Sequence, residues 1–402
     1  MTNSLSNFKK QIWDRRIQMD LNKTLVALPL ARFGFSEVTG ATRFHRPAKT
    51  RLYAVSYTAE TPLATQPLGS TDEYLDVDQT RAVHFFLDDT QKLESAYDIM
   101  NMYAPEAVYA LRNEMDGKFF AQVVNAFHTC GKLDIEWSGT NAQGATLTTS
   151  NIVKALSIVK ATLVRNNVET TTPFFIVLEP MIAALWEQTL SGTGNNVADT
   201  TLRNGYLASL PALWLDVYVS NNVMHTTTFT STKNLAANDT LVVWPITIKI
   251  VASPSAANDV DLWASEAETL ANIAAFINGS GTAGTTYIEC TQANRAFLSQ
   301  NLVKATVGSD NHTIVITSAG YVDITEGTDS GTAYSLWETD ALMMAGQKGC
   351  VDMVIQKSVM SETQRGTSKW LIGTYVTTWT KYWIKTFNEG KQRMVALNAK
   401  MK

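Results

Sequence analysis

The sequence predicts an α+β protein built from several folding units, with a further α/β domain inserted into the chain. Three observations predict this class. A long apolar helical stripe begins near Pro105, helices and strands alternate between residues 148 and 225, and a segment rich in Thr, Ala, Asn, Ser and Gly begins at about residue 226. Alternating helices and strands favour a mixed architecture, and an abrupt change of composition marks a candidate domain boundary.

Composition limits the class of protein further. The chain has 402 residues, of which 45% are hydrophobic and only 17% are charged, with a formal net charge of −4. Its length corresponds to two or three folding units at about 150 residues each. The low charged fraction favours extensive subunit contacts over an isolated monomer, and the basic excess typical of nucleic-acid-binding proteins is missing. The sequence has no run of about 18 apolar residues, so no membrane span is predicted.

The beginning of the chain predicts two arms. Residues 1–50 combine a basic start with Pro29 and Pro47 and predict an extended N-terminal arm. Strands are predicted at Arg51–Tyr57 and Arg81–Phe86, with a long polar connection between them. A connection of this length is usually functional or disordered, so we interpret it as an arm that clasps a neighbouring subunit.

The strongest helix signal follows these arms. Pro105 suits the first helical position, and apolar residues spaced three or four apart predict a helix over residues 105–128. A helical stretch at Lys92–Tyr103 is expected to lead into it. The next predicted elements alternate between helix and strand: a helix from Ile152, a strand at Phe174–Leu178, a short helix from Pro180 and a strand at Leu213–Val219.

The segment that follows predicts a compact unit with its own core. Its predicted elements are a strand at Val242–Val251, helices at Ala264–Ile277 and Ala293–Leu302, a strand at Thr285–Glu289, and a hairpin at His312–Thr325. Insertions are tolerated at exposed loop tips whose ends lie close together. After the insertion, Ala341–Gly349 predicts a helix or loop, and strands are predicted at Cys350–Ile355, Thr374–Thr386 and Arg393–Leu397.

This order of elements, together with Thr172–Met181 and Gly205–Val219, resembles the major capsid proteins of tailed bacteriophages with the Hong Kong 97-like fold. The resemblance rests on architecture more than on motif and covers nearly the whole chain outside the insertion. It implies an N-terminal arm (1–50), an E-loop (51–86) and a peripheral domain with a spine helix (87–147). It further implies an axial domain in two segments (148–225 and 340–366), an insertion domain between them (226–339), and C-terminal strands of the peripheral domain (367–402).

The resemblance implies a structural protein and not an enzyme. Such a protein self-assembles into hexamers and pentamers that form an icosahedral head around double-stranded DNA. The implied partners are further copies of the chain, scaffolding and portal proteins, a decoration protein, and packaged DNA contacted non-specifically, with no membrane. The implied location is the virion, after assembly in the host cytoplasm. An encapsulin-like shell enclosing an enzyme cargo is the alternative, which the large insertion disfavours.

Charged residues of the E-loop are the predicted inter-subunit contacts: Arg51, Glu60, Asp72, Glu73, Asp76, Asp78 and Arg81. Their carboxylates could pair with basic residues of a neighbour, but exposed single ion pairs contribute only ~0–1 kcal/mol. We therefore expect apolar contact to supply most of the affinity. Residues 51–86 contain no lysine, so the covalent lysine cross-link of the family's type member is not expected.

No other pattern predicts chemistry. The five histidines are scattered, and the three cysteines form no C-x-x-C pair, so no catalytic, metal-binding or disulfide site is predicted. Residues Gly279–Gly284 spell G-x-G-x-x-G, but the predicted helix precedes them, whereas a dinucleotide site needs a helix after them. We interpret them as a flexible turn and predict no cofactor. The insertion could also bind a surface ligand, which the sequence does not identify.

Overall fold

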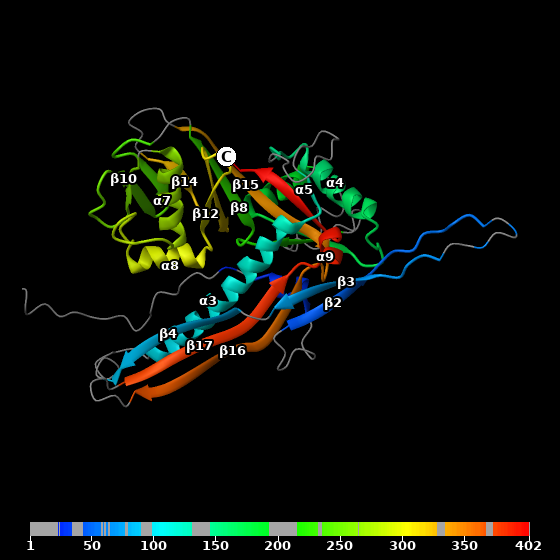
Figure 1. The fold of residues 1–402 in the computed structure, drawn as a ribbon, viewed down its shortest axis with the longest axis horizontal. Coiled ribbons are helices and arrows are strands. Elements are labelled where there is room, and N and C mark those ends of the chain that lie inside the picture. Colours follow the sequence, from blue (N-terminus) through cyan, green and yellow to red (C-terminus); the bar gives the residue numbers. More distant parts are fainter. Residues whose placement is uncertain are drawn as a thin grey trace, which may run out of the picture.

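The computed structural model describes most of the chain, drawn in Figure 1: residues 23, 25–33, 43–57, 59, 62, 65–76, 79–89, 99–130, 145–192, 215–231, 235–263, 265–327, 334–366 and 373–401. The predicted N-terminal arm 1–50 therefore lies largely outside the described residues. Its described portion includes the short helix α1 (Ala27–Leu30) and the two-residue strand β1 (Arg32–Phe33).

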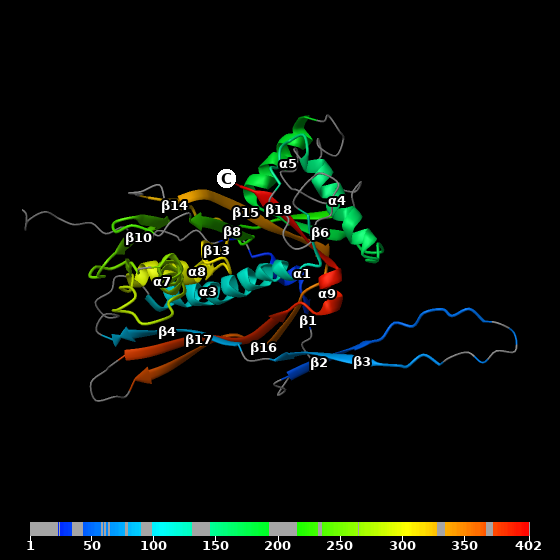
Figure 2. The ribbon, with the colours of Figure 1, turned by 45° about the horizontal axis from the view of Figure 1, so that its top comes forward.

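A long four-stranded sheet forms one side of the molecule. Its order is β1–β16–β17–β4, where β16 is Asp352–Gly366, β17 is Gly373–Lys385 and β4 is Gln79–Asp88. The long helix α3 (Ile99–Ala121) lies across one face of this sheet, as Figure 2 shows. The strands predicted at Arg81–Phe86 and Thr374–Thr386 are confirmed, and they are direct neighbours in this sheet.

Helix α3 confirms the helix predicted over residues 105–128 but begins earlier and ends earlier than expected. It spans Ile99–Ala121, and a 3₁₀ turn, η2, continues it over Gln122–Asn125. Pro105 lies inside the helix and not at its start. Proline removes one hydrogen bond from the second turn of a helix. The burial of Leu111, Met115 and Phe119 stabilises the rest of the helix.

A second, eight-stranded sheet forms the opposite layer. Six strands follow the order β12–β13–β8–β15–β18–β5, and β6 joins β15 to β7. The strands are β5 (His128–Cys130), β6 (Phe174–Leu178), β7 (Leu215–Val219), β8 (Met224–Ser231), β12 (Lys304–Val307), β13 (Thr313–Ala319), β15 (Tyr334–Gln347) and β18 (Met394–Lys400).

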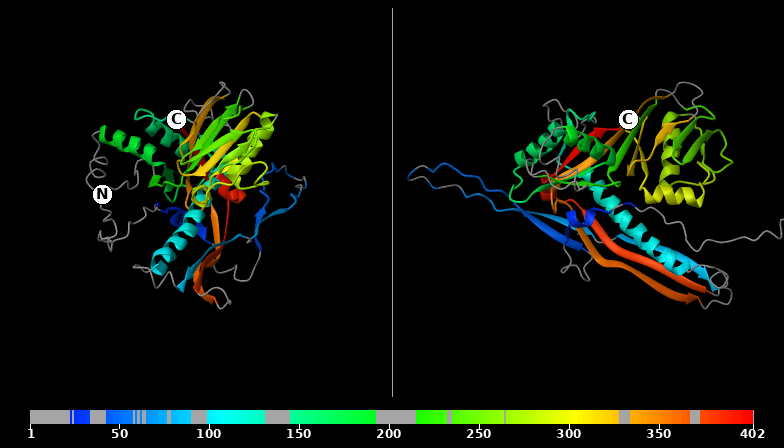
Figure 3. Two further views of the ribbon diagram at one scale, coloured as in Figure 1. Left: turned by 90° about the vertical axis from the view of Figure 1, so that its left-hand side faces the viewer. Right: turned by 180° about the vertical axis from the view of Figure 1, so that it is seen from behind.

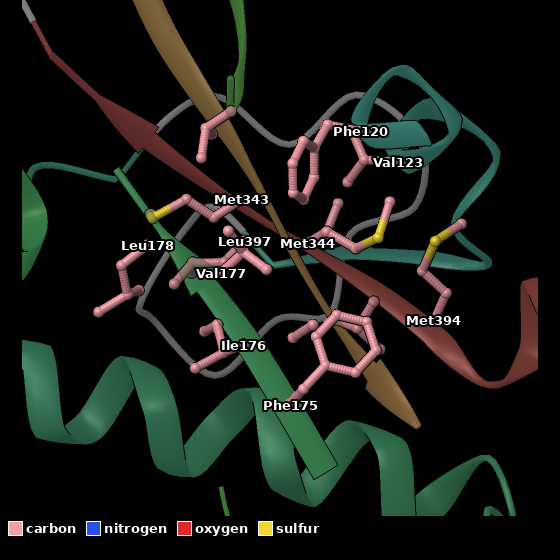
Figure 4. Close-up of a cluster of buried hydrophobic side chains, with 14 of the residues drawn as sticks. Phe120, Val123, Phe175, Ile176, Val177, Leu178, Met343, Met344, Met394 and Leu397 are labelled. Atoms are coloured by element: carbon pink, nitrogen blue, oxygen red, sulfur yellow. The ribbon is translucent and has the colours of Figure 1, made fainter. Parts of the chain in front are cut away.

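The main core lies where this sheet meets its helices. Phe175 and Ile176 of β6, Met344 of β15 and Leu397 of β18 are buried together, as Figure 4 shows. Two helices accompany β6 along the chain, α4 (Ile152–Arg165) and α5 (Pro180–Gly192). The predicted helix–strand–helix–strand order of this region is confirmed.

One prediction in this region was wrong. Residues 341–349 were expected to form a helix or loop, but Ala341–Gln347 belong to the long strand β15. This strand has neighbours on both sides, β8 and β18, and five consecutive residues from Ala341 to Ala345 are almost all buried. A strand buried on both faces reads as a continuous apolar run, which periodicity cannot distinguish from a buried helix.

The segment predicted as an insertion has a separate apolar core. A four-stranded sheet in the order β11–β10–β9–β14 packs with two helices. These elements are β9 (Thr240–Val243), β10 (Ile246–Val251), β11 (Asp259–Asp261), β14 (Ile324–Glu326), α7 (Glu266–Asn278) and α8 (Gln292–Gln300). Both predicted helices are confirmed. Strands β8, β12 and β13 belong to the eight-stranded sheet, so this unit shares a sheet with the main body.

Three strand predictions in this unit were wrong. The single strand expected over 242–251 is a hairpin, because the chain turns at Trp244 and Pro245. The hairpin expected over 312–325 does not form, because β13 pairs with β8 and β12 whereas β14 pairs with β9. Residues 285–289 make only isolated bridges at Tyr287.

A two-stranded hairpin projects from the end of the long sheet. It pairs β2 (Arg43–Lys49) with β3 (Ser70–Asp76), and we call residues 43–76 the hairpin arm. Figure 3 shows it extending away from the body, in the direction opposite to the far ends of β16 and β17. Of the two strands predicted on either side of the polar connection, the one at Arg51–Tyr57 is therefore wrong. Residues 51–57 form no strand, and β4 belongs to the long sheet.

Candidate inter-subunit surface

The root of the hairpin arm is fixed to the body by a small apolar cluster. Leu75 of β3 is buried against Val354 of β16 and Phe387, which precedes α9 (Asn388–Gln392). Phe44 of β2 and Trp383 of β17 pack against the same cluster. A two-stranded hairpin is marginally stable by itself, so this cluster sets where the arm leaves the body.

Polar contacts add to this attachment. The Arg46 guanidinium lies 2.9 Å from the Asp352 carboxylate and 3.1 Å from that of Glu389. Burial raises the pKa of Asp352, and the positive charge of Arg46 opposes that shift. The backbone N–H of Asn388 donates to Glu73 over 3.0 Å. These contacts join the arm to β16 and α9, so the arm has a defined direction at its root.

Two ion pairs lie across the β2–β3 ladder. Arg43 Nε lies 2.5 Å from Asp76 Oδ1, and the guanidinium also lies over the Tyr74 ring, 4.0 Å from its centroid. This hydrogen bond lowers the pKa of Asp76. His45 Nδ1 lies 2.6 Å from Asp72 Oδ2. Cross-strand pairs of this kind add to the stability of a hairpin.

The predicted contact residues are thus only partly brought together. Asp72, Glu73 and Asp76 share strand β3, and each already has a partner within the chain. Arg51 lies exposed just beyond the ladder. Arg81 belongs to β4 and pairs with Glu114 of α3 at 3.0 Å, away from the hairpin arm. Glu60 and Asp78 lie outside the described residues. A role for these residues between subunits stays a prediction.

The outer portion of the hairpin arm carries a surface that was not predicted as a contact site. Its large apolar side chains are strongly exposed: Leu52 61%, Tyr53 72%, Val55 47%, Tyr57 68% and Leu68 84%. We call residues 50–69 the arm tip. The closely spaced apolar residues of Arg51–Tyr57, which predicted a strand, were the available signal. Apolar residues gathered on a projecting arm mark an interaction surface.

Two sets of hydrogen bonds connect the two sides of the arm tip among its described residues. The Gln66 side chain accepts from the Tyr53 N–H at 3.1 Å and donates to the Tyr53 carbonyl at 2.6 Å. At the inner end, the Thr50 N–H and hydroxyl both donate to the Gly69 carbonyl, at 2.9 and 2.8 Å. These contacts keep the two sides of the tip together while leaving its apolar side chains in solvent.

A buried polar junction connects the start of the described chain to α3. Asp116 of α3 accepts hydrogen bonds from the backbone N–H groups of Val26 and Ala27, at 2.9 and 2.7 Å, and from Asn222 Nδ2 at 2.9 Å. Burial raises the pKa of Asp116, and these hydrogen bonds oppose the shift. Nearby, Lys23 Nζ donates to the Asn301 side chain at 3.0 Å. The junction therefore joins α1, α3 and the segment before β8.

The described residues offer no candidate metal site. Within them, no group of three or more His, Cys, Asp or Glu side chains could hold a metal ion. Gly279 ends α7 in the left-handed conformation, with φ 63°, so the G-x-G-x-x-G sequence forms the turn after a helix. Among the helices that the structure describes, none is long and apolar enough to cross a membrane.

Comparison with known proteins gives a consistent result at the level of fold. No protein-family profile and no curated protein sequence matches the chain. A solved structure from Mycobacterium phage Che8 matches with a TM-score of 0.57 and 12% identity, covering 98% of both chains. A capsid structure of cyanophage P-SCSP1u matches with a TM-score of 0.55 and 11% identity, covering 99% of this chain and 95% of the other.

A third solved structure, the asymmetric unit of the mature capsid of bacteriophage PhiM1, matches with a TM-score of 0.52 and 10% identity. It covers 97% of this chain and 92% of the other. The mixed helix-and-sheet fold predicted from the sequence is thus confirmed as one shared with phage capsid structures over nearly the full chain.

Proposed function

We propose that this chain is the major capsid protein of a tailed bacteriophage, a structural protein that acts by assembling with copies of itself. The observation that carries the proposal is a fold shared almost end to end with phage capsid structures. The exposed apolar arm tip supports it independently, because a protein that stayed monomeric would gain nothing from holding these side chains in water.

In this proposal the copies form hexamers and pentamers that tile an icosahedral head around double-stranded DNA. The net charge of −4 suits a container that contacts DNA without binding it tightly. Scaffolding and portal proteins would act during assembly in the host cytoplasm, and a decoration protein could bind the finished virion. No step of this function requires catalysis or a cofactor.

We further propose a domain division for the assembled subunit. The E-loop is the hairpin arm, residues 43–76, and the spine helix is α3. The peripheral domain takes in β16 as well as 367–402, since β16 pairs with β17. Residues 148–225 and 340–351 make the axial domain, and residues 226–339 make the insertion domain.

The hairpin arm is the proposed clasp between neighbours. Its described carboxylates, Asp72, Glu73 and Asp76, have partners in their own chain, so the apolar arm tip is the better candidate for contact with the next subunit. Burying apolar surface contributes about 25 cal/mol per Å², whereas exposed ion pairs contribute ~0–1 kcal/mol. Beyond Lys49, the last residue of β2, the hairpin arm contains no lysine, which favours a shell held by non-covalent contacts.

Electron microscopy of the purified chain, expressed alone and with its neighbouring virion proteins, tests the proposal. We expect uniform closed shells of icosahedral symmetry, with DNA in particles taken from infected cells. A chain that stays monomeric under all these conditions contradicts the proposal. Shells that enclose a protein cargo and no DNA would instead support a cargo-enclosing compartment.

A further inference from the structure

A cavity of about 490 Å³ lies between α3 and the helices α7 and α8. Its lining residues come from β4, α3, the end of α7, α8 and the start of β12. Figure 2 shows α7 and α8 beside α3, with β4 below them. Cavities of roughly 300–1,000 Å³ are the size at which proteins hold small molecules. The cavity is therefore large enough for a small ligand, and it is built from elements other than the hairpin arm.

The charged groups that line this cavity are four cations and one carboxylate: Arg81, Lys118, Arg295, Lys304 and Glu114. The charge of Arg295 is already balanced, because its guanidinium pairs with Glu289 and donates to the carbonyls of Phe276 and Ile277 at the end of α7. The other three cations have Glu114 alone between them. The cavity therefore carries an excess of positive charge in a chain whose net charge is −4.

The contacts of Glu114 show how little of this charge is balanced. Its Oε1 atom lies 3.0 Å from Arg81 Nε and 2.8 Å from Lys118 Nζ, so one oxygen serves two cations. Lys118 also donates to Gln79 Oε1 at 2.7 Å. Burial lowers the pKa of Lys118; Glu114 opposes this shift, and the charges of Arg81 and Lys304 add to it. A bound anion would offset the repulsion among these cations.

Two of the cations can reach a ligand. Lys304 is exposed at the start of β12, and its Nζ forms no ion pair or hydrogen bond with the described residues. Arg81 pairs with Glu114 through Nε, and its side chain is 49% exposed. Its fork of N–H donors suits phosphate oxygens, and lysine adds a point charge. A phosphate group carries about −1.5 to −2 charge and three acceptor oxygens, which matches this excess better than a single carboxylate does.

We infer that the cavity between β4, α3, α8 and β12 binds a small phosphate-bearing anion, with Lys304 and Arg81 as its direct contacts and Lys118 adding positive charge behind them. Nucleoside phosphates and inorganic polyphosphates share this chemistry. Leu111, Leu298 and Leu302 are also among the lining residues, so a ligand with an apolar portion fits as well. The inference goes beyond the proposed function and does not depend on it.

Calorimetric titration of the full chain tests the site, with sodium tripolyphosphate and ATP as probes and the ionic strength held constant with sodium chloride. We expect saturable binding of at least one probe, with tighter binding of ATP assigning the site to nucleotides and tighter binding of tripolyphosphate to inorganic polyphosphate. Lys304→Gln should weaken binding at least about tenfold, because a charged hydrogen bond is lost. Lys304→Arg keeps the charge and should keep binding.

Lys249→Gln is the matched control, since Lys249 is an exposed lysine on the neighbouring strand β10. It should bind both probes as the parent does. No saturable binding of either probe, or equal losses for Lys304→Gln and Lys249→Gln, overturns the inference. A short double-stranded oligonucleotide serves as a third probe. If it binds through Lys304 while both small probes fail, the site belongs to the DNA backbone and the inference is wrong.

Thermal unfolding distinguishes a ligand contact from a structural role of Lys304. In chloride, Lys304→Gln should unfold at the parent's temperature or slightly above it, because it removes a charge that repels Lys118. With tripolyphosphate it should unfold below the parent, since a ligand that binds the folded chain raises only the parent's unfolding temperature. Lys249→Gln corrects for the general stabilisation that excluded anions give. A loss in chloride that does not grow with tripolyphosphate contradicts the inference.

Discussion

Asp116 lies on the buried face of α3, where an unpaired carboxylate would be costly. Three hydrogen bonds offset that cost, two from the backbone of the segment that starts α1 and one from Asn222. A single side chain therefore satisfies donors from two segments far apart in the sequence. It supports the position of the described N-terminal segment against the body.

Replacing Asp116 by Ala should destabilise the chain by about 3 kcal/mol or more, because three buried donors would lose their acceptor. Asp116→Asn should cost less, since its oxygen can still accept and the desolvated charge is removed. Urea denaturation of the unassembled chain measures both effects. The control, Asp72→Ala, removes an exposed ion pair and should cost less than about 1 kcal/mol; equal losses for Asp116→Ala and this control would contradict the role of Asp116.

Because of His225, the free energy of unfolding should decrease as the pH falls. It is buried, its Nδ1–H donates to the Val223 carbonyl at 2.9 Å, and Lys23 lies near enough to disfavour a second proton. Burial lowers its pKa from 6.5 to about 4. The unfolded chain therefore binds this proton at a higher pH than the folded chain does. The resulting stability, about 3 kcal/mol, is present above pH 6.5 and is lost as the pH falls toward 4.

Comparison of His225→Gln with the parent chain between pH 7 and pH 4 isolates this effect. The raised pKa values of Asp116, Glu179 and Asp352 act in the opposite direction in both chains and cancel in the difference. We expect His225→Gln to lose less stability on acidification than the parent. His84→Gln, an exposed control, should keep the parent's acid dependence because His225 is intact. Parallel curves for His225→Gln and the parent would refute the assignment.

The sequence predicted that the E-loop carries charged residues, but not which groups those residues contact. Asp72, Glu73 and Asp76 lie on one strand. The groups that meet them are the side chains of His45 and Arg43 and the backbone N–H of Asn388, and no sequence pattern connects these positions to the strand. Cross-strand register depends on the turn and on packing at the root, so it could not be derived from local sequence.

At the scale of elements, α3 packs closely against the segment predicted as an insertion. Gly117 lies where a Cβ would be 2.7 Å from Leu302 Cδ1 and 3.0 Å from Ala319 Cβ. Glycine costs a helix about 1 kcal/mol against alanine, so its use here reflects the close approach of these residues. The unit and the spine helix therefore act as one packed body at this point.

Gly117→Ala should destabilise the chain by about 1–2 kcal/mol despite its better helix propensity, because the added methyl group overlaps its neighbours. Leu302→Ala removes the side chain that would lie nearest to the added methyl group. In a double-mutant cycle, Leu302→Ala should therefore cost less in the Gly117→Ala background than in the parent. Additive effects in thermal unfolding would show that the contact is not close.

The strand predicted at Arg51–Tyr57 shows that hydrophobic patterns can assign a strand to the wrong residues of an exposed arm. Its residues favour a strand, but the structure gives them no ladder within the chain. The real strand of the arm, Arg43–Lys49, contains Pro47 and four basic residues and has no apolar alternation that would reveal it. A strand on an exposed hairpin can form without burying a face, so hydrophobic periodicity does not detect it.

At the scale of the whole molecule, the sequence predicted the elements that bury apolar surface better than those that project. Strand β6, helices α4 and α7 and the long strand β17 all match, because each has a clear apolar pattern. The arrangement of the arm could not be predicted in this way. Its attachment comes from a small root cluster, and its tip leaves large apolar side chains exposed, so no apolar core within the chain defines it.

This division between core and tip leads to a last prediction. Leu52, Tyr53 and Leu68 are 61–84% exposed and belong to no core cluster of the described residues. Replacing all three with serine should change the unfolding free energy of the single chain by no more than about 0.5 kcal/mol. The same change should abolish shells, because the apolar surface offered to the next subunit is gone.

Two measurements on the same preparation decide between this expectation and a structural role. Thermal unfolding reports the stability of the single chain, and electron microscopy with sedimentation reports shells. The matched control, Leu52→Ile, Tyr53→Phe and Leu68→Ile, keeps the apolar surface and should keep shells. Normal shells from the serine variant would show that the tip makes no essential contact, and a large loss of single-chain stability would show that the tip packs within its own subunit. Lost shells with unchanged stability would place the contribution of the tip between subunits.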